Sequence, residues 1–232
     1  MRHKWHVDNA KEFEEREKEL LKKYFQNQEP TIKGNIHITA GKVKNFALEI
    51  PHGTRPATSR IRTRVFDILG QDIYKKRILD LYAGTGAFGL ESLSRGASEA
   101  VFVDASKSAE KILLNNIKKT GFLTETEIFR EKVTNYLTET ASDEDEAFDI
   151  IFMDPPYKLY NTKDTSKINQ IIDLSGRLLP GVKDSGFEGF KGALIIKHPR
   201  KYDLSGLDLS PLRILETLDF GLNSVSILIV TS

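Results

Sequence analysis

From Arg77 onward, short apolar runs alternate with longer stretches in which apolar residues recur at helical spacing. The apolar runs have the length of buried strands and comprise Ile78–Tyr82, Ala100–Val103, Phe148–Met153 and Ala193–Ile196. The helical stretches are Phe88–Arg95, Ser108–Lys119 and Thr165–Leu179. This alternation predicts an α/β fold of the Rossmann-like kind, a mostly parallel sheet with helices on both faces.

The C-terminal part of the chain breaks this alternation. Arg213–Phe220 and Ser224–Val230 are both rich in strand-forming residues, and only residues 221–223 separate them. So short a connection predicts an antiparallel hairpin that closes the sheet.

Smaller units precede the alternating region. Residues 36–50 predict a hairpin of two short strands, residues 59–70 a helix with one apolar stripe, and residues 11–25 another helix. We therefore expect three units: an N-terminal helical extension over 1–31, a hairpin and helix over 32–70, and a main domain over 71–232.

Composition excludes several classes of protein. The chain of 232 residues has no cysteine, which rules out disulfides and thiolate chemistry. No apolar stretch approaches the roughly 20 residues that cross a bilayer, and no secretory leader is visible. The five histidines show no paired spacing. These features predict a cytoplasmic protein with no bound metal and no membrane partner, and we expect a monomer.

Charge is balanced overall, with 34 basic and 33 acidic residues, but it is unevenly distributed. Between Lys33 and Arg64 there are seven basic residues and one acid, so the local charge is 7 − 1 = +6. A local positive field of this kind is typical of a surface that binds nucleic acid. The stretch from Thr124 to Ile150 has nine acids and two bases, and we expect it to be a solvated loop.

A glycine-rich turn connects the first strand of the main domain to the helix that follows. Gly84, Gly86 and Gly89 fit G-x-G-x-x-G, and Asp104 follows twenty residues after Gly84 at the end of the next strand. This spacing is typical of a nucleotide site in which the distal carboxylate accepts the ribose hydroxyls. The pattern alone does not separate a dinucleotide from S-adenosylmethionine.

Asp80 favours the second cofactor. Its carboxylate lies within the strand, four residues before Gly84, where it would repel a pyrophosphate and attract a cation. S-adenosylmethionine carries a sulfonium and an amino group and no phosphate. An NAD-dependent oxidoreductase remains the alternative from another class.

A second motif, Asp154-Pro155-Pro156-Tyr157, directly follows the buried strand that ends at Met153. The Asp154 carboxylate and the Pro155 carbonyl can both accept hydrogen bonds from an NH2 group, and Tyr157 offers a flat face for a base. Two acceptors localise the lone pair of an aromatic amine, and a well-positioned amine can then attack an electrophilic methyl group. The motif therefore predicts methyl transfer to an exocyclic amine.

Together these motifs resemble the class I S-adenosylmethionine-dependent methyltransferases that act on exocyclic amines. More narrowly, residues 38–41, 53–62 and 84–91 resemble the RsmD type of bacterial small-subunit (16S) rRNA guanine-N2 methyltransferases. The segment Arg55-Pro56-Ala57-Thr58-Ser59-Arg60-Ile61-Arg62 is its most discriminating part. The resemblance implies a seven-stranded sheet, S-adenosylmethionine as cofactor, and one guanine of small-subunit rRNA, in an assembling or assembled 30S particle, as substrate.

The resemblance also assigns roles to residues. It implies that the glycine turn and its surroundings hold the cofactor and that the Asp-Pro-Pro-Tyr tetrapeptide holds the guanine. The cofactor candidates are Asp80, Tyr82, Ala83, Gly84, Thr85, Gly86, Asp104, Ala105, Lys132, Val133 and Asp154. The RNA-backbone candidates are Arg55, Arg60, Arg62 and Arg64. Alternatives within the same fold are an adenine-N6 methyltransferase, which commonly has Asn in place of Asp154, and a protein-amide methyltransferase. A non-catalytic RNA-binding assembly factor that keeps the fold is a further alternative.

Overall fold

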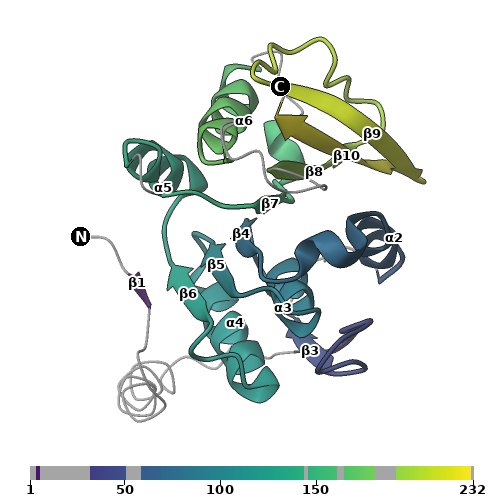
Figure 1. Cartoon of the computed structure of the whole chain (residues 1–232), viewed down its shortest axis with the longest axis vertical. Helices are drawn as coiled ribbons and strands as arrows, with labels where there is room; N and C mark the ends of the chain where they lie inside the picture. Colours follow the sequence, from purple (N-terminus) through teal and green to yellow (C-terminus); the bar gives the residue numbers. More distant parts are fainter. Residues whose placement is uncertain are drawn as a thin grey trace.

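A mixed sheet forms the centre of the molecule, as the sequence predicts (Figure 1). The computed structural model describes residues 4–5, 32–50, 59–143, 146–160, 165–180 and 192–230. Within these residues the main sheet has the strand order β1-β6-β5-β4-β7-β8-β10-β9, and a separate two-stranded sheet has the order β2-β3.

The strands of the main sheet are β1 (Lys4–Trp5), β4 (Arg77–Leu81), β5 (Glu99–Val103), β6 (Thr126–Phe129), β7 (Ile150–Met153), β8 (Ala193–Pro199), β9 (Leu212–Phe220) and β10 (Asn223–Val230). The small hairpin consists of β2 (Ile32–His37) and β3 (Ala47–Ile50). From β6 to β8 all neighbours are parallel, whereas β10 pairs antiparallel with both β8 and β9. The predicted C-terminal hairpin is therefore confirmed.

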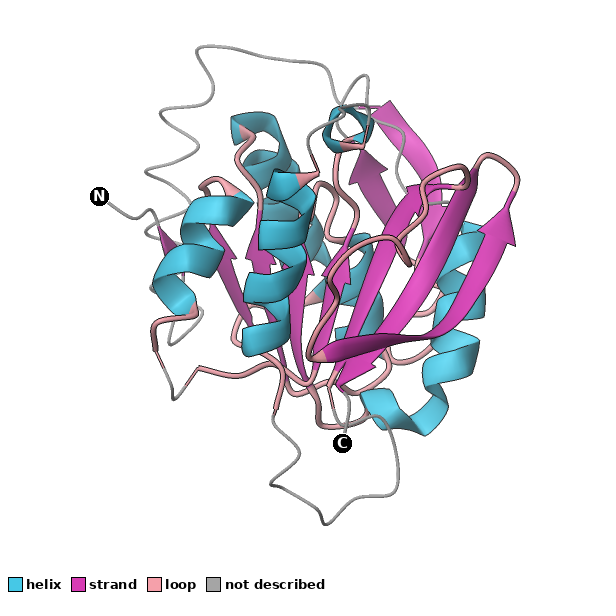
Figure 2. Cartoon of the chain, turned by 90° about the horizontal axis from the view of Figure 1, so that it is seen from above, coloured by secondary structure: helices cyan, strands magenta, loops and turns pink. Residues whose placement is uncertain are grey.

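The helices are α2 (Ser59–Leu69), α3 (Ala87–Ser94), α4 (Lys107–Thr120), α5 (Val133–Thr140) and α6 (Ser166–Arg177), with short 3-10 turns η1 (Gly70–Ile73) and η2 (Tyr157–Leu159). Figure 2 shows helices on both faces of the sheet. One core cluster joins α2, α3 and α4 to one face, and a second joins α5 and α6 to the other. The central strands are buried on both faces, which is why they appear in the sequence as continuous apolar runs.

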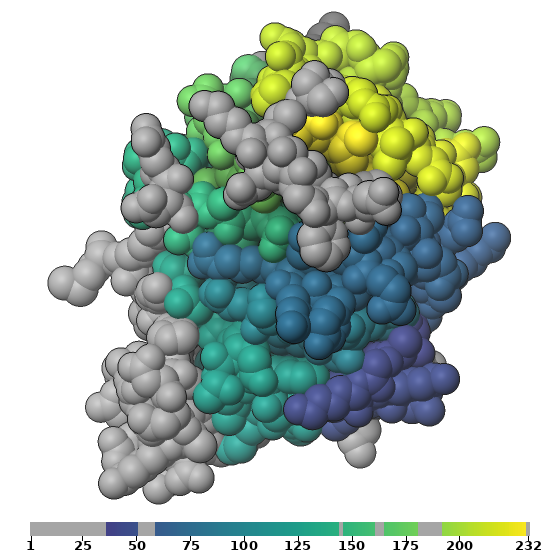
Figure 3. Space-filling view, viewed as in Figure 1, coloured from purple at the N-terminus to yellow at the C-terminus, as the bar shows by residue number. Residues whose placement is uncertain are grey.

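The β2–β3 hairpin is fastened to α3 by polar contacts, and its described part lies at the surface in Figure 3 (purple). The fully buried carboxylate of Glu91 accepts hydrogen bonds from the Thr39 N–H (2.8 Å), the Thr39 hydroxyl (2.6 Å) and the Ala40 N–H (3.1 Å). Gly41 has φ +85°, and a Cβ there would lie 1.8 Å from the carbonyl oxygen of Ser94. The loop can therefore approach α3 this closely only with glycine at position 41.

Arg62 belongs to the interior and not to an RNA-binding surface. It is 0% exposed, and its Nη2 donates a hydrogen bond to the His37 carbonyl at 2.7 Å. Burial lowers the pKa of Arg62, and the charge of Glu91 opposes this effect. The prediction that Arg62 contacts the RNA backbone is therefore wrong, because its side chain has no surface left for a ligand.

Two further expectations need correction. The acidic stretch from Thr124 to Ile150 is not simply a solvated loop, because it contains β6 and α5 and reaches the start of β7. The sheet also gains an eighth strand, β1, which pairs antiparallel with the edge strand β6 and lies within the predicted N-terminal extension. The predicted helix over residues 11–25 lies outside the described residues.

Candidate active site

The parallel strands bring both predicted motifs to one edge of the sheet. Strand β4 lies between β5 and β7, so the residues that follow Leu81, Val103 and Met153 are neighbours at the carboxyl ends of their strands. Ligands of open α/β sheets bind at this edge. The glycine turn follows β4, Asp104 follows β5, and the Asp154 tetrapeptide follows β7.

The glycine turn has the backbone of a tight ligand-binding loop. Tyr82, Gly84 and Gly86 have φ values of 59°, 54° and 74°, and the Gly86 N–H donates to the Ala83 carbonyl at 2.8 Å. A Cβ on Gly84 would meet nothing closer than 3.9 Å, so this part of the turn is open. At Gly89 a Cβ would lie 2.3 Å from the ring of Phe102. The motif thus allows α3 to pack closely on β5 and leaves the first glycine free for a ligand.

Asp80 lies beneath the turn and supports it. Its Oδ2 accepts a hydrogen bond from the Gly89 N–H at 3.0 Å, and the residue is 3% exposed. Burial raises the pKa of Asp80 to about 8, with smaller contributions from the charges of Asp154 and Asp104. A cation held near this carboxyl would favour its ionised form.

Asp104 links the glycine turn that follows β4 to the loop that follows β5. Its Oδ2 accepts from the Gly84 N–H at 2.9 Å, and its Oδ1 accepts from the Ser106 N–H at 2.8 Å. Burial raises the pKa of Asp104, whereas these two hydrogen bonds lower it. An ionised carboxylate can accept about four hydrogen bonds, so capacity remains for ribose hydroxyls.

The other cofactor candidates lie around the same edge. Ala105 is exposed beside Asp104, and Thr85 is buried within the turn. Lys132 is exposed at the start of α5, just beyond β6, whereas Val133 packs into the core on the α5 and α6 face.

Asn116 connects the glycine turn to the N-terminal hairpin. Its Nδ2 donates to the carbonyls of Thr85 and Glu49, both at 3.0 Å, and its Oδ1 accepts from the Glu49 N–H at 2.8 Å. The side chain is 0% exposed. One buried amide on α4 thus fixes both β3 and the loop that begins α3.

Replacing Asn116 by alanine is expected to lower the free energy of unfolding by about 1–3 kcal/mol, because buried partners at Glu49 and Thr85 lose their hydrogen bonds. The glycine turn would also lose an anchor, so affinity for the cofactor should fall. Denaturant unfolding and calorimetry would measure the two effects. Asn115→Ala is the matched control, since among the described residues Asn115 makes only a 3.3 Å hydrogen bond to the Glu49 carboxylate. Equal behaviour of the two variants would contradict the anchoring role.

The tetrapeptide after β7 forms a compact polar group with the end of β8. Lys197 Nζ contacts both oxygens of Asp154, at 2.7 Å and 2.9 Å. The same ammonium lies 5.8 Å from the centre of the Tyr157 ring. Tyr157 is 47% exposed, and its hydroxyl donates to Oδ1 of Asn223 at the start of β10. An accessible aromatic face and a carboxylate are therefore held side by side.

Two effects act in opposite directions on the pKa of Asp154. Burial raises its pKa, whereas the charge and the hydrogen bonds of Lys197 lower it. The carboxylate keeps 25% of its side-chain surface, so it remains accessible to a ligand from the edge of the sheet. Pro155 is buried and Pro156 is exposed, and the two proline rings restrict the backbone where the chain leaves the strand.

Two residues of this group do not belong to either motif. Lys197 could be suspected from the sequence only because a lysine follows the buried apolar run Ala193–Ile196, and Asn223 gives no signal. Tyr160 supports the backbone of Lys197, since its hydroxyl donates to the Lys197 carbonyl at 2.9 Å. Arg55, another predicted RNA contact, lies outside the described residues.

The fold is the Rossmann-like fold of the class I methyltransferases. A solved protein from Escherichia coli, provisionally described as a methyltransferase, shares the fold with a TM-score of 0.65 at 21% identity, covering 85% of this chain and 98% of that chain. A hypothetical protein from a Thermus species gives a TM-score of 0.63 at 30% identity, covering 83% and 98% of the two chains.

The family follows from the sequence match. The family described as "Conserved hypothetical protein 95" matches residues 36–179, more than half of the chain. The chain therefore belongs to this family, the RsmD type, and the resemblance found in the sequence is confirmed.

Curated relatives carry a more specific name. "Ribosomal RNA small subunit methyltransferase D" from Escherichia coli K12 is 30% identical over 129 residues, which cover 54% of this chain and 62% of that protein. The protein of the same name from Buchnera aphidicola (strain APS) is 33% identical over 124 residues, covering 53% and 63%. These matches span slightly less than two thirds of each relative.

Proposed function

We propose that the chain is an S-adenosylmethionine-dependent methyltransferase that modifies the N2 amino group of one guanine in small-subunit rRNA. The observation that carries this proposal is the position of Asp154 and Tyr157 beside the glycine turn at one sheet edge. The names of the curated relatives support rRNA as the substrate. A solved methyltransferase-fold neighbour, 16% identical with a TM-score of 0.59, was crystallised with S-adenosylhomocysteine.

The residues of the glycine turn suit this cofactor. Gly84 leaves room for close approach to the backbone, and Asp104 retains acceptor capacity for ribose hydroxyls. Asp80 supplies a buried carboxyl whose ionised form a cation stabilises. When bound, S-adenosylmethionine supplies an electrophilic methyl group on a sulfonium.

The tetrapeptide then acts on the target base. We propose that Asp154 and the Pro155 carbonyl accept the two hydrogens of the amine while Tyr157 stacks on the extruded base. These contacts localise the nitrogen lone pair and aim it for direct attack, so that the rate gain comes from positioning and electrostatics. No covalent enzyme intermediate and no metal are needed in this pathway.

Several finer points belong to the same proposal. We propose an assembling or assembled 30S particle as the natural substrate and a monomeric enzyme, because one chain supplies both motifs. We further propose that the enzyme is cytoplasmic, since its proposed substrate is rRNA.

Among the described residues, no helix is long and apolar enough to cross a membrane. In the same ranges, no cluster of three or more His, Asp or Glu could hold a metal ion.

The decisive experiment is methyl transfer from labelled S-adenosylmethionine to small ribosomal subunits from cells that lack the enzyme, followed by mapping of the modified nucleotide. An N2-methylguanine in rRNA would support the proposal. Transfer to adenine or to DNA would favour the adenine-N6 alternative. Calorimetric binding of NAD but not of S-adenosylmethionine would favour the oxidoreductase.

A further inference from the structure

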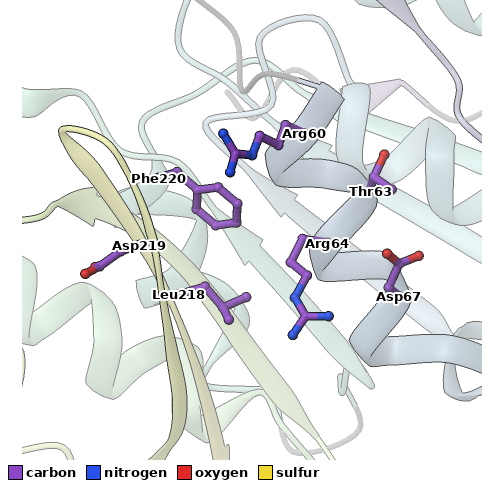
Figure 4. A pocket seen from close by; sticks show the side chains of 7 residues that line it. All are labelled: Arg60, Thr63, Arg64, Asp67, Leu218, Asp219 and Phe220. Atoms are coloured by element: carbon purple, nitrogen blue, oxygen red, sulfur yellow. The ribbon is translucent and has the colours of Figure 1, made fainter.

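A groove of about 500 Å³ lies between α2 and the C-terminal hairpin (Figure 4). Ligand pockets typically have volumes of about 300–1,000 Å³, so the groove can take a group of nucleotide size. Its lining residues are Arg60, Thr63, Arg64, Asp67, Leu218, Asp219 and Phe220. None of the motifs that define the family includes the β9 side of this groove.

The α2 wall is basic where it faces β9. Arg60 and Arg64 are one turn apart, and in Figure 4 both side chains lean toward the hairpin, whereas Thr63 and Asp67 lie on the other flank of the helix. Both arginines are exposed, and within the described parts of the chain neither guanidinium has an ion-pair partner. Their charges are therefore available to a ligand.

The β9 wall is apolar and aromatic. Leu218 and Phe220 point toward α2, and Phe220 packs against the core on the α2 side, which holds its ring in place. Asp219 points to the opposite face of β9. There it accepts a hydrogen bond from the Ser224 hydroxyl at 2.6 Å and pairs with Arg200 at 3.0 Å, so its charge is compensated away from the groove.

The Phe220 end of the groove borders the active site. Phe220 pairs with Asn223 across the hairpin, and Asn223 in turn pairs with Pro199 at the end of β8. The side chain of Asn223 accepts the hydroxyl of Tyr157. A polymer whose target base rests on Tyr157 can therefore continue past the tip of the hairpin and into the groove.

We infer that this groove binds the single-stranded RNA next to the target nucleotide, with phosphates on Arg60 and Arg64 and a flanking base against Phe220. The inference rests on the proposed function. Guanidinium groups are suited to phosphate oxygens, and an aromatic face stacks on an unpaired base whatever its sequence. In this arrangement the C-terminal hairpin forms part of the substrate site as well as closing the sheet.

The test measures RNA binding by fluorescence anisotropy, with a labelled short single-stranded RNA titrated at several salt concentrations. Arg60→Ala and Arg64→Ala should each weaken binding and lower the salt slope by about one counterion. Phe220→Leu keeps an apolar side chain but loses the stacking face, so binding should weaken about five- to tenfold with the salt slope unchanged. Affinity for S-adenosylmethionine should stay at the wild-type value in all three variants.

Arg213→Ala is the matched control. Like Arg60 and Arg64, Arg213 is an exposed arginine, but it lies on β9 at the end of the strand away from Phe220. Wild-type affinity and salt slope in the Arg60, Arg64 and Phe220 variants would overturn the inference. Defects that occur only with ribosomal particles and not with the RNA would also overturn it, since the groove would then bind a protein. The proposed function is tested separately, because it fails if the wild-type enzyme forms no N2-methylguanine in rRNA, whatever the groove variants do.

Discussion

Methyl transfer by the Asp154→Ala variant is expected to fall by at least about 10²–10³-fold, the usual effect of removing one essential hydrogen-bonding group in an active site. Alanine removes both side-chain oxygens that we assign to the target amine. The glycine turn and Asp104 are untouched, so affinity for S-adenosylmethionine should be largely retained. Single-turnover transfer to rRNA and calorimetry with the cofactor would measure the two quantities.

Asp154→Asn separates acceptor geometry from charge. The amide keeps one acceptor oxygen in a side chain of the same shape, but it cannot form the ion pair with Lys197. We expect activity between that of wild type and Asp154→Ala. Full activity of the alanine variant would remove Asp154 from the mechanism, whereas loss of cofactor binding in both variants would assign it to the cofactor site.

The position of the glycine turn and Asp104 at one sheet edge was predictable because the signals for these residues are local. A strand, a glycine turn, a helix start and a distal carboxylate occupy Ile78 to Asp104, and the structure places them at one edge as the βαβ connection requires. The tetrapeptide was predictable for the same reason, since it directly follows a buried strand. Neither motif requires knowledge of contacts between distant parts of the chain in order to be recognised in the sequence.

The other residues of the candidate site are brought into place by contacts between distant parts of the chain. Lys197 reaches Asp154 from 43 residues away, and Asn223 reaches Tyr157 from 66 residues away. Both approaches follow from the pairing of β8 with β7 and with β10, which the sequence does not specify residue by residue. A lysine that follows a buried apolar run is compatible with a solvated loop until the neighbouring strand is known.

Arg62 shows the same limitation in a helix. On an isolated α2, Arg62 borders the apolar stripe on the side opposite Arg60 and Arg64, and either side could face solvent. In the fold the end of β2 covers that side, and the His37 carbonyl accepts a hydrogen bond from the guanidinium. Helical periodicity gives the direction of a side chain but not the element that will be packed against it.

The ion pair between Lys197 and Asp154 has a consequence for the pH dependence of catalysis. Burial alone raises the pKa of Asp154, and Lys197 is the group that opposes this rise. Asp80 and Tyr160 also lie close enough for their own pKa values to respond to the Asp154 charge. The carboxylate is needed in its ionised form, so activity should be present above the pKa of Asp154 and lost below it.

Replacing Lys197 by methionine should therefore move the acidic limb of the pH–rate profile to higher pH. Without the ammonium, the pKa of Asp154 rises further, and a larger fraction of the enzyme is protonated and inactive at neutral pH. The rate should recover as the pH increases, which a merely unfolded variant would not do. Lys197→Arg keeps the positive charge, so its profile should stay near that of wild type, although the different geometry of guanidinium can lower the maximum rate.

Lys201→Met provides the control, because Lys201 is an exposed lysine in the turn just after β8. Its pH profile should match that of wild type. Single-turnover rates across the pH range, with thermal unfolding recorded for each variant, would distinguish a shifted pH–rate profile from a uniformly lowered one. A Lys197→Met profile that is lowered uniformly at every pH would contradict a role in keeping Asp154 ionised, because a purely positional defect does not depend on the proton. The shifted profile, by contrast, would show that β8 supplies the charge that lets a buried carboxylate at the end of β7 act as a hydrogen-bond acceptor at neutral pH.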